Sequence, residues 1–148
     1  MSLSMRNQLP GTVTSITTGE AMAAVKVRLE GGQNVTAAIT ADAVHDLGLA
    51  EGATVRILVK ATEVALATAP VDGVSIRNQM PGTVSEVSSG GAMASVKMDI
   101  EGGSLTAAIT KDAASDLGLA AGTSVVALVK STDISLEHDP DSREPATG

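Results

Sequence analysis

The sequence predicts an all-β fold with one short helix in each of two tandem modules. Residues 6–13 return almost unchanged as residues 77–84, so the chain is a duplication. Within each copy, hydrophobic residues alternate with polar ones in short runs, which is the pattern of half-buried strands. The period is too long and the copies too few for a solenoid, so each copy is predicted to be a small domain.

In the first module, strands are predicted for runs of alternating hydrophobic and polar residues, or of β-branched residues, that lie between glycine-containing turns. Pro10 favours extended backbone before it, and Gly31-Gly32 is predicted to form a hairpin turn rather than a nucleotide cradle. The predicted strands are residues 12–17, 22–30, 35–39 and 55–60, and Val64 and Leu66 complete the last strand or begin a short fifth one.

One short helix is predicted at residues 41–47. Thr40 is suited to cap its first turn, and Asp42 in that turn complements the helix dipole. Gly48 follows the last helical residue, where a left-handed conformation ends many helices.

The order of three strands, a helix and two strands favours two tandem OB-like five-stranded barrels over a sandwich. We expect a first domain at residues 4–68, a short linker at 69–74 and a second domain at 75–138. Residues 139–148 show no apolar periodicity and are predicted to be a disordered tail.

Composition limits the classes of function. The chain of 148 residues has a formal net charge of −7 and contains no Phe, Tyr, Trp or Cys. These features argue against a nucleic-acid-binding barrel, which needs stacking aromatic residues and a basic groove. They also argue against binding to an anionic membrane surface. No apolar run is long enough to span a membrane, so a cytoplasmic protein is expected. Small modules without disulfides gain stability by oligomerisation, and a homo-oligomer is expected.

The inventory for catalysis is poor. His45 and His138 are the only histidines, and Ser115 and Thr68 stand at the matching repeat positions. A duplicated histidine site is therefore not expected, and the chain is predicted not to be an enzyme. The aspartates that recur on the short helices are Asp42, Asp46, Asp112 and Asp116. Capping and solvation explain them better than metal binding, and no metal ion is expected to be coordinated directly by side chains.

A set of anion donors does recur. Arginine, lysine, hydroxyl groups and backbone amides of small residues together suit a tetrahedral dianion, because none of them repels it. The alternative is that these residues are solvated ends of strands. The recurring positions are Ser4, Arg6 and Asn7 with Ser75, Arg77 and Asn78, and Lys60, Ala61 and Thr62 with Lys130, Ser131 and Thr132.

These motifs resemble the molbindin family of Mop-type molybdate-binding domains. The resemblance rests on Ser-x-Arg-Asn-Gln-x-x-Gly-x-Val at residues 4–13 and 75–84, Asp-Leu-Gly-Leu at 46–49 and 116–119, and Val-Lys followed by small and hydroxyl residues at 59–62 and 129–132. It covers both modules.

The resemblance implies OB-like domains that hold molybdate or tungstate, without an organic cofactor, between modules and subunits of a trimer. It adds the backbone amides around Ala21, Met22, Ala92 and Met93 to the expected oxyanion-binding residues. The function it implies is cytoplasmic molybdenum storage and homeostasis. The alternatives are an oxyanion sensor acting on a separate partner protein and, less favoured, a nucleic-acid-binding OB protein.

Overall fold

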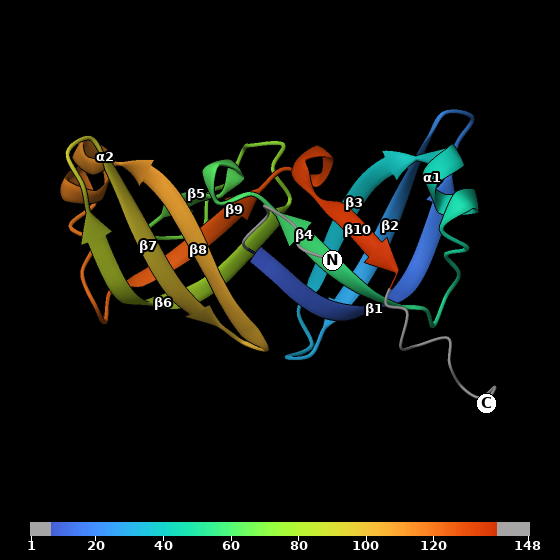
Figure 1. The fold of residues 1–148 in the computed structure, drawn as a ribbon, viewed down its shortest axis with the longest axis horizontal. Coiled ribbons are helices and arrows are strands. Elements are labelled where there is room, and N and C mark those ends of the chain that lie inside the picture. Colours follow the sequence, from blue (N-terminus) through green and yellow to red (C-terminus); the bar gives the residue numbers. More distant parts are fainter. Residues whose placement is uncertain (1–6, 139–148) are drawn as a thin grey trace.

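The computed structural model describes residues 7–138, which form two curled five-stranded sheets lying side by side, with a short helix at each outer end (Figure 1). The predicted disordered tail and the predicted donors Ser4 and Arg6 lie outside the described residues.

The predicted elements are present in both repeats. The first repeat contains β1 (Asn7–Thr18), β2 (Met22–Leu29), β3 (Asn34–Thr40), α1 (Ala41–Asp46), β4 (Thr54–Val59), the 3-10 turn η1 (Ala61–Glu63) and β5 (Ala65–Ala67). The second repeat contains β6 (Asn78–Ser89), β7 (Met93–Ile100), β8 (Gly103–Thr110), α2 (Lys111–Asp116), β9 (Ser124–Val129), the 3-10 turn η2 (Ser131–Asp133) and β10 (Ser135–His138).

The fifth strand of each sheet comes from the other repeat. The strand order is β10-β4-β1-β2-β3 in one sheet and β5-β9-β6-β7-β8 in the other. The chain therefore passes from the first sheet to the second at η1 and returns at η2. The predicted linker at residues 69–74 lies between β5 and β6, which belong to the same sheet, so the boundaries of the repeats differ from those of the sheets.

The first strand is longer than the sequence predicts, because β1 continues through Pro10. Pro10 is in register with Arg56 of β4, whereas pairing with β2 begins only at Gly11. A proline is tolerated at a position where one side of the strand is unpaired, since its missing N–H then breaks no ladder on that side. The predicted extended segment and the following predicted strand are thus one element.

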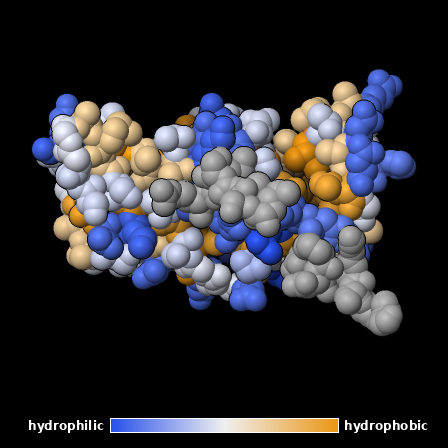
Figure 2. Space-filling model, in the orientation of Figure 1, coloured by the Kyte–Doolittle hydropathy of each residue, from blue (hydrophilic) through white to orange (hydrophobic). Residues whose placement is uncertain are grey.

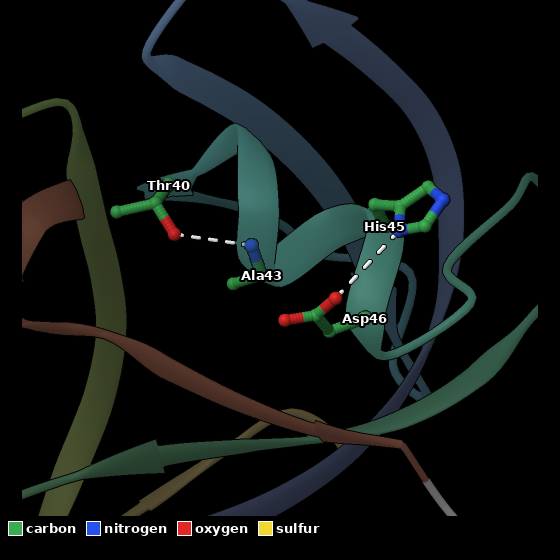
Figure 3. Close-up of polar contacts among 4 residues, drawn as sticks. All are labelled: Thr40, Ala43, His45 and Asp46. Carbon is green, nitrogen blue, oxygen red and sulfur yellow. Dashed lines mark hydrogen bonds and ion pairs between the residues drawn. The ribbon is translucent and has the colours of Figure 1, made fainter.

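Both helices begin at the predicted threonine caps. The Oγ1 atom of Thr40 accepts a hydrogen bond from the backbone nitrogen of Ala43 at 3.1 Å (Figure 3), and Thr110 caps Ala113 in the same way. Gly48 has a φ of 65°, as expected for the residue that follows the helix and its C-cap, Leu47. No helix within residues 7–138 is long and apolar enough to cross a membrane.

The core is a single cluster that includes residues of both sheets. Its side chains are aliphatic or methionine, and its most buried members include Val25 and Val27 of β2 with Val96 and Met98 of β7. Leu136 on β10 also belongs to this cluster, and its strand comes from the second repeat but completes the first sheet. Burial is therefore shared across the repeats, as expected for modules near the lower size limit for independent folding.

The two hairpin turns after β2 and β7 approach each other closely in the middle of the molecule (Figure 1). A Cβ atom on Gly31 would lie 2.6 Å from the Cβ atom of Glu101, and one on Gly102 would lie 2.6 Å from the nitrogen of Gly31. Only glycine allows the backbones to pass at this distance. The Gly-Gly pairs thus form hairpin turns, as predicted, and these turns also make one of the contacts between the repeats.

Candidate functional site

Two matching regions lie where the chain crosses between the sheets. In the first, η1 packs against β8, and in the second, η2 packs against β3. We refer to these regions as the first junction and the second junction. Each joins a segment of one repeat to a strand of the other, and both lie near the middle of the molecule (Figure 1).

A buried asparagine stands at each junction. The side chain of Asn7 donates from Nδ2 to the carbonyl oxygen of Thr106 at 2.8 Å and accepts from the Thr106 nitrogen at 2.7 Å. Asn78 makes the equivalent pair of bonds with Thr36, both at 2.9 Å. Each amide side chain thus extends the hydrogen bonding of a strand in the other repeat, and these bonds occupy the Asn oxygen and part of the donor capacity of its nitrogen.

The two predicted basic segments begin next to these asparagines. Asn7 is in register with Val59, and Lys60 and Ala61 follow directly at the first junction. The side chains of Lys60 and Thr62 are exposed, while Ala61 is half-buried. The structure therefore places Asn7 next to the segment formed by Lys60, Ala61 and Thr62.

The second junction has the same arrangement with one additional polar contact. Asn78 is in register with Val129, and Lys130, Ser131 and Thr132 follow. The Nδ2 atom of Asn78 also donates to the Oγ atom of Ser131 at 3.4 Å. Because the Ser131 oxygen accepts this bond, its own O–H remains suited to donate to a ligand.

A groove of about 460 Å³ opens at the first junction. Its lining contains hydroxyl groups, one lysine, one carboxylate and two alanines. Its lining residues are Ala61, Glu86, Ser88, Ser95, Lys97, Thr106 and Ala108. Apart from Ala61 these residues were not predicted from the sequence. Thr106 lines this groove, and its repeat counterpart Thr36 bonds Asn78 at the second junction. This repetition is the signal by which sequence reasoning could have found the two threonines.

Other predicted donors lie away from the junctions within this chain. Met22 is about half exposed and is in register with Thr40, at the opposite end of β1 from Asn7. The carbonyl oxygen of Ala21 accepts a hydrogen bond from Ala41 at 2.8 Å. Ala92 and Met93 hold the equivalent places in the second repeat, where Ala92 accepts from Lys111 and Met93 is exposed.

The predicted donors before β6 are exposed. Ser75 and Arg77 lie in the connection from β5 to β6, and Arg77 lines a second hollow, of about 550 Å³, with Asp72 and Gln79. Gln79 holds this connection through two hydrogen bonds to the backbone of Val71, at 2.9 and 3.0 Å. Arg77 immediately precedes Asn78, so its backbone adjoins the second junction.

The two histidines line one hollow of about 720 Å³ beside α1. His138 Nδ1 lies 2.9 Å from the carbonyl oxygen of Leu47, and His45 Nδ1 lies 3.6 Å from Asp46 Oδ1 (Figure 3). Hydrophobic side chains are visible beside α1 on the molecular surface (Figure 2). Within residues 7–138 no group of three or more histidine and acidic side chains is arranged to hold a metal ion.

The fold and the paired junctions define a protein of two tandem OB-like barrels that share strands. The TOBE domain model matches the chain twice, at residues 3–66 and 74–136. The chain therefore belongs to the TOBE-domain family, and the resemblance to tandem Mop-type domains predicted from the sequence is confirmed.

Relatives of known name carry the same tandem region. The chain is 38% identical to the molybdenum-pterin-binding protein MopB of Rhodobacter capsulatus over 135 residues, covering 90% of this chain and 50% of MopB. It is 36% identical to the molybdenum transport protein ModE of Herbaspirillum seropedicae over 132 residues, covering 88% of this chain and 49% of ModE. The chain thus spans about half the length of these two relatives.

A solved structure matches over its whole length. The cytoplasmic molybdate-binding protein ModG, in a crystal form with molybdate bound, superposes with a TM-score of 0.90 at 35% sequence identity. The match covers 94% of this chain and 100% of ModG. The tandem fold predicted from the sequence is therefore confirmed.

Proposed function

We propose that the chain binds molybdate or tungstate as a cytoplasmic oxyanion-binding protein that serves molybdenum storage and homeostasis, without catalysing a reaction. The observation that carries the proposal is the match to molybdate-bound ModG, which extends over all of that protein. The relatives MopB and ModE are also named for molybdenum. The match to ModG also supports a cytoplasmic location, since that protein is described as cytoplasmic.

The chemistry of the junctions supports an anion as ligand. Lys60 and Lys130 place exposed ammonium groups beside 3-10 turns whose first two residues are small or carry hydroxyls and whose third residue is acidic, Glu63 or Asp133. Charge-assisted hydrogen bonds from such donors are shorter and stronger than neutral ones. A tetrahedral dianion can accept hydrogen bonds from lysine, hydroxyl and backbone amide donors at once. A monovalent halide forms fewer directed hydrogen bonds with such a set.

A trimer completes the proposed site. The turn residues Ala21, Met22, Ala92 and Met93 lie far along β1 and β6 from the junction donors of their own repeats. Met22 and Met93 are large apolar side chains left about half exposed. Association of three chains would cover these side chains and bring the turn amides of one subunit toward the donors of another.

The test is native mass spectrometry with elemental analysis of the purified chain after incubation with molybdate. We expect molybdenum to remain bound after desalting, on a trimeric species. Sulfate in ten-fold excess should compete poorly, because a smaller tetrahedron leaves some donors unpaired at about 1–3 kcal/mol each. Phosphate should compete still less, since its proton needs an acceptor. A protein free of molybdenum after this treatment would overturn the proposal.

A further inference from the structure

The two junctions carry different charges although the repeats that build them are closely similar. Glu86 lines the groove of the first junction, and its carboxylate accepts a hydrogen bond from the Ser88 hydroxyl at 3.5 Å. The matching position in the first repeat is Ser15, which is neutral. Each of these residues follows the register shift of its strand, so they occupy the same place in the fold.

A lysine stands opposite each of these positions. Glu86 is in register with Lys97, and Ser15 is in register with Lys26. The first junction therefore combines one lysine with one carboxylate across β6 and β7. At the matching place on β1 and β2, Lys26 faces a hydroxyl. The local charge beside the second junction is more positive by one unit.

The 3-10 turns differ in the same sense. Ala61 borders the groove of the first junction, whereas its counterpart Ser131 adds a hydroxyl that is positioned by Asn78. Ser95 in the first groove is matched by Ala24, whereas Ser15 and Ser131 take the places of Glu86 and Ala61, so the second junction has one more hydroxyl donor and one fewer carboxylate than the first. Both differences favour an anion at the second junction.

We propose that the carboxylate of Glu86 makes the first junction the weaker of two unequal oxyanion sites. This inference rests on the proposed function, because it concerns the affinity of the same two junctions for the same ligand. The effect is electrostatic. Glu86 is exposed, so water and salt screen its repulsion of a dianion, and we expect it to change affinity by about five-fold at low ionic strength.

The test is calorimetric titration of the full chain with molybdate at low salt, comparing the native protein with Glu86→Ser and Ser15→Glu. The native chain should show two classes of site. Glu86→Ser should tighten the weaker class by about five-fold, and Ser15→Glu should weaken the tighter class by a similar factor. Both differences should shrink as salt is added.

Glu51→Ser is the matched control, because it removes one exposed carboxylate in the turn before β4 and changes the net charge equally without touching the groove. Its affinities should stay within two-fold of the native values. Circular dichroism checks that each variant is folded. Equal affinity at both classes of site in the native chain, or an effect of Glu86→Ser no larger than that of Glu51→Ser, would overturn the inference while leaving the proposed function standing. Absence of molybdate binding by the native chain would overturn both.

Discussion

Asn7 on β1 and Thr106 on β8, 99 residues apart in sequence, are joined by a pair of side-chain to backbone hydrogen bonds of 2.8 and 2.7 Å. Asn7 is almost completely buried, so replacing it by alanine leaves the backbone N–H and C=O of Thr106 without partners. Each unsatisfied buried group costs about 1–3 kcal/mol. Asn7→Ala should therefore lower the free energy of unfolding by about 2–4 kcal/mol, measured by urea denaturation.

The control for this variant is Asn34→Ala, since Asn34 is an exposed asparagine at the start of β3. It should change the stability by less than about 0.5 kcal/mol, as is usual for surface substitutions. Equal stability of Asn7→Ala and Asn34→Ala would contradict a structural role for the buried amide.

The close approach of the hairpin turns predicts a large penalty for Gly31→Ala. The added methyl group would lie 2.6 Å from the Cβ atom of Glu101 and 2.7 Å from its carbonyl carbon. Relief of this overlap requires the backbone to move, and overpacking of this kind costs about 1–3 kcal/mol. The melting temperature should fall accordingly. Gly91→Ala is the control, because a Cβ atom there meets nothing within 4 Å and should leave the melting temperature unchanged or raise it. Equal changes of the melting temperature in both variants would be inconsistent with the close approach of the two hairpin turns.

The basic residues of the junctions should affect binding rather than folding. Lys60→Ala and Lys130→Ala truncate exposed side chains, so little stability is lost. Loss of a charge-assisted donor costs about 1.5–3 kcal/mol, which corresponds to a roughly ten-fold to hundred-fold weaker affinity for molybdate. Equilibrium dialysis measures this change. Arg28→Ala, which truncates an exposed arginine near the hairpin end of β2, is the control and should bind normally. Native affinity in both junction variants would mean that the donor set is wrong.

The exchange of fifth strands predicts how one repeat behaves alone. A chain ending at residue 68 lacks β10, and the edge of β4 that pairs with Ser135–His138 is left open. Its own β5 carries Leu66 where β10 carries Leu136, so β5 of a second copy can fill the place. We expect light scattering to show no species smaller than a dimer in which each copy donates β5 to the other, and three such dimers form a hexamer if the tandem chain is a trimer as proposed. A folded monomer at micromolar concentration would rule out this arrangement.

The strands, turns and helix caps could be predicted from the sequence because each depends on local chemistry. Thr40 and Thr110 cap their helices, and the Gly-Gly pairs form hairpins, as their residue types require. The exchange of the fifth strands could not be predicted, since Leu66 and Leu136 lie in nearly identical patterns. Both strands suit the edge of β4 by their residue pattern, and the sequence alone does not decide which of them pairs with it.

The candidate site was predictable in composition but not in detail. Repetition identified Asn7, Lys60 and Ala61, and the structure brings them together at one junction. The sequence did not indicate that Asn7 binds the backbone of the other repeat, because this contact depends on the placement of β8. The placement of Glu86 in the groove was equally hidden, since its significance appears only when Glu86 and Ala61 are seen to line the same groove.

The crossing of the chain at η1 and η2 also determines what proteolysis can separate. Cleavage within residues 68–77 falls in a loop between two strands of the same sheet, so the two fragments should remain associated as a single particle. Cleavage at η1 instead separates β4 from β5, and then only the C-terminal fragment retains a strand, β10, that belongs to the sheet of the other fragment. The two repeats are therefore held together by the folding of each sheet, and their association does not depend on an intact peptide bond between them.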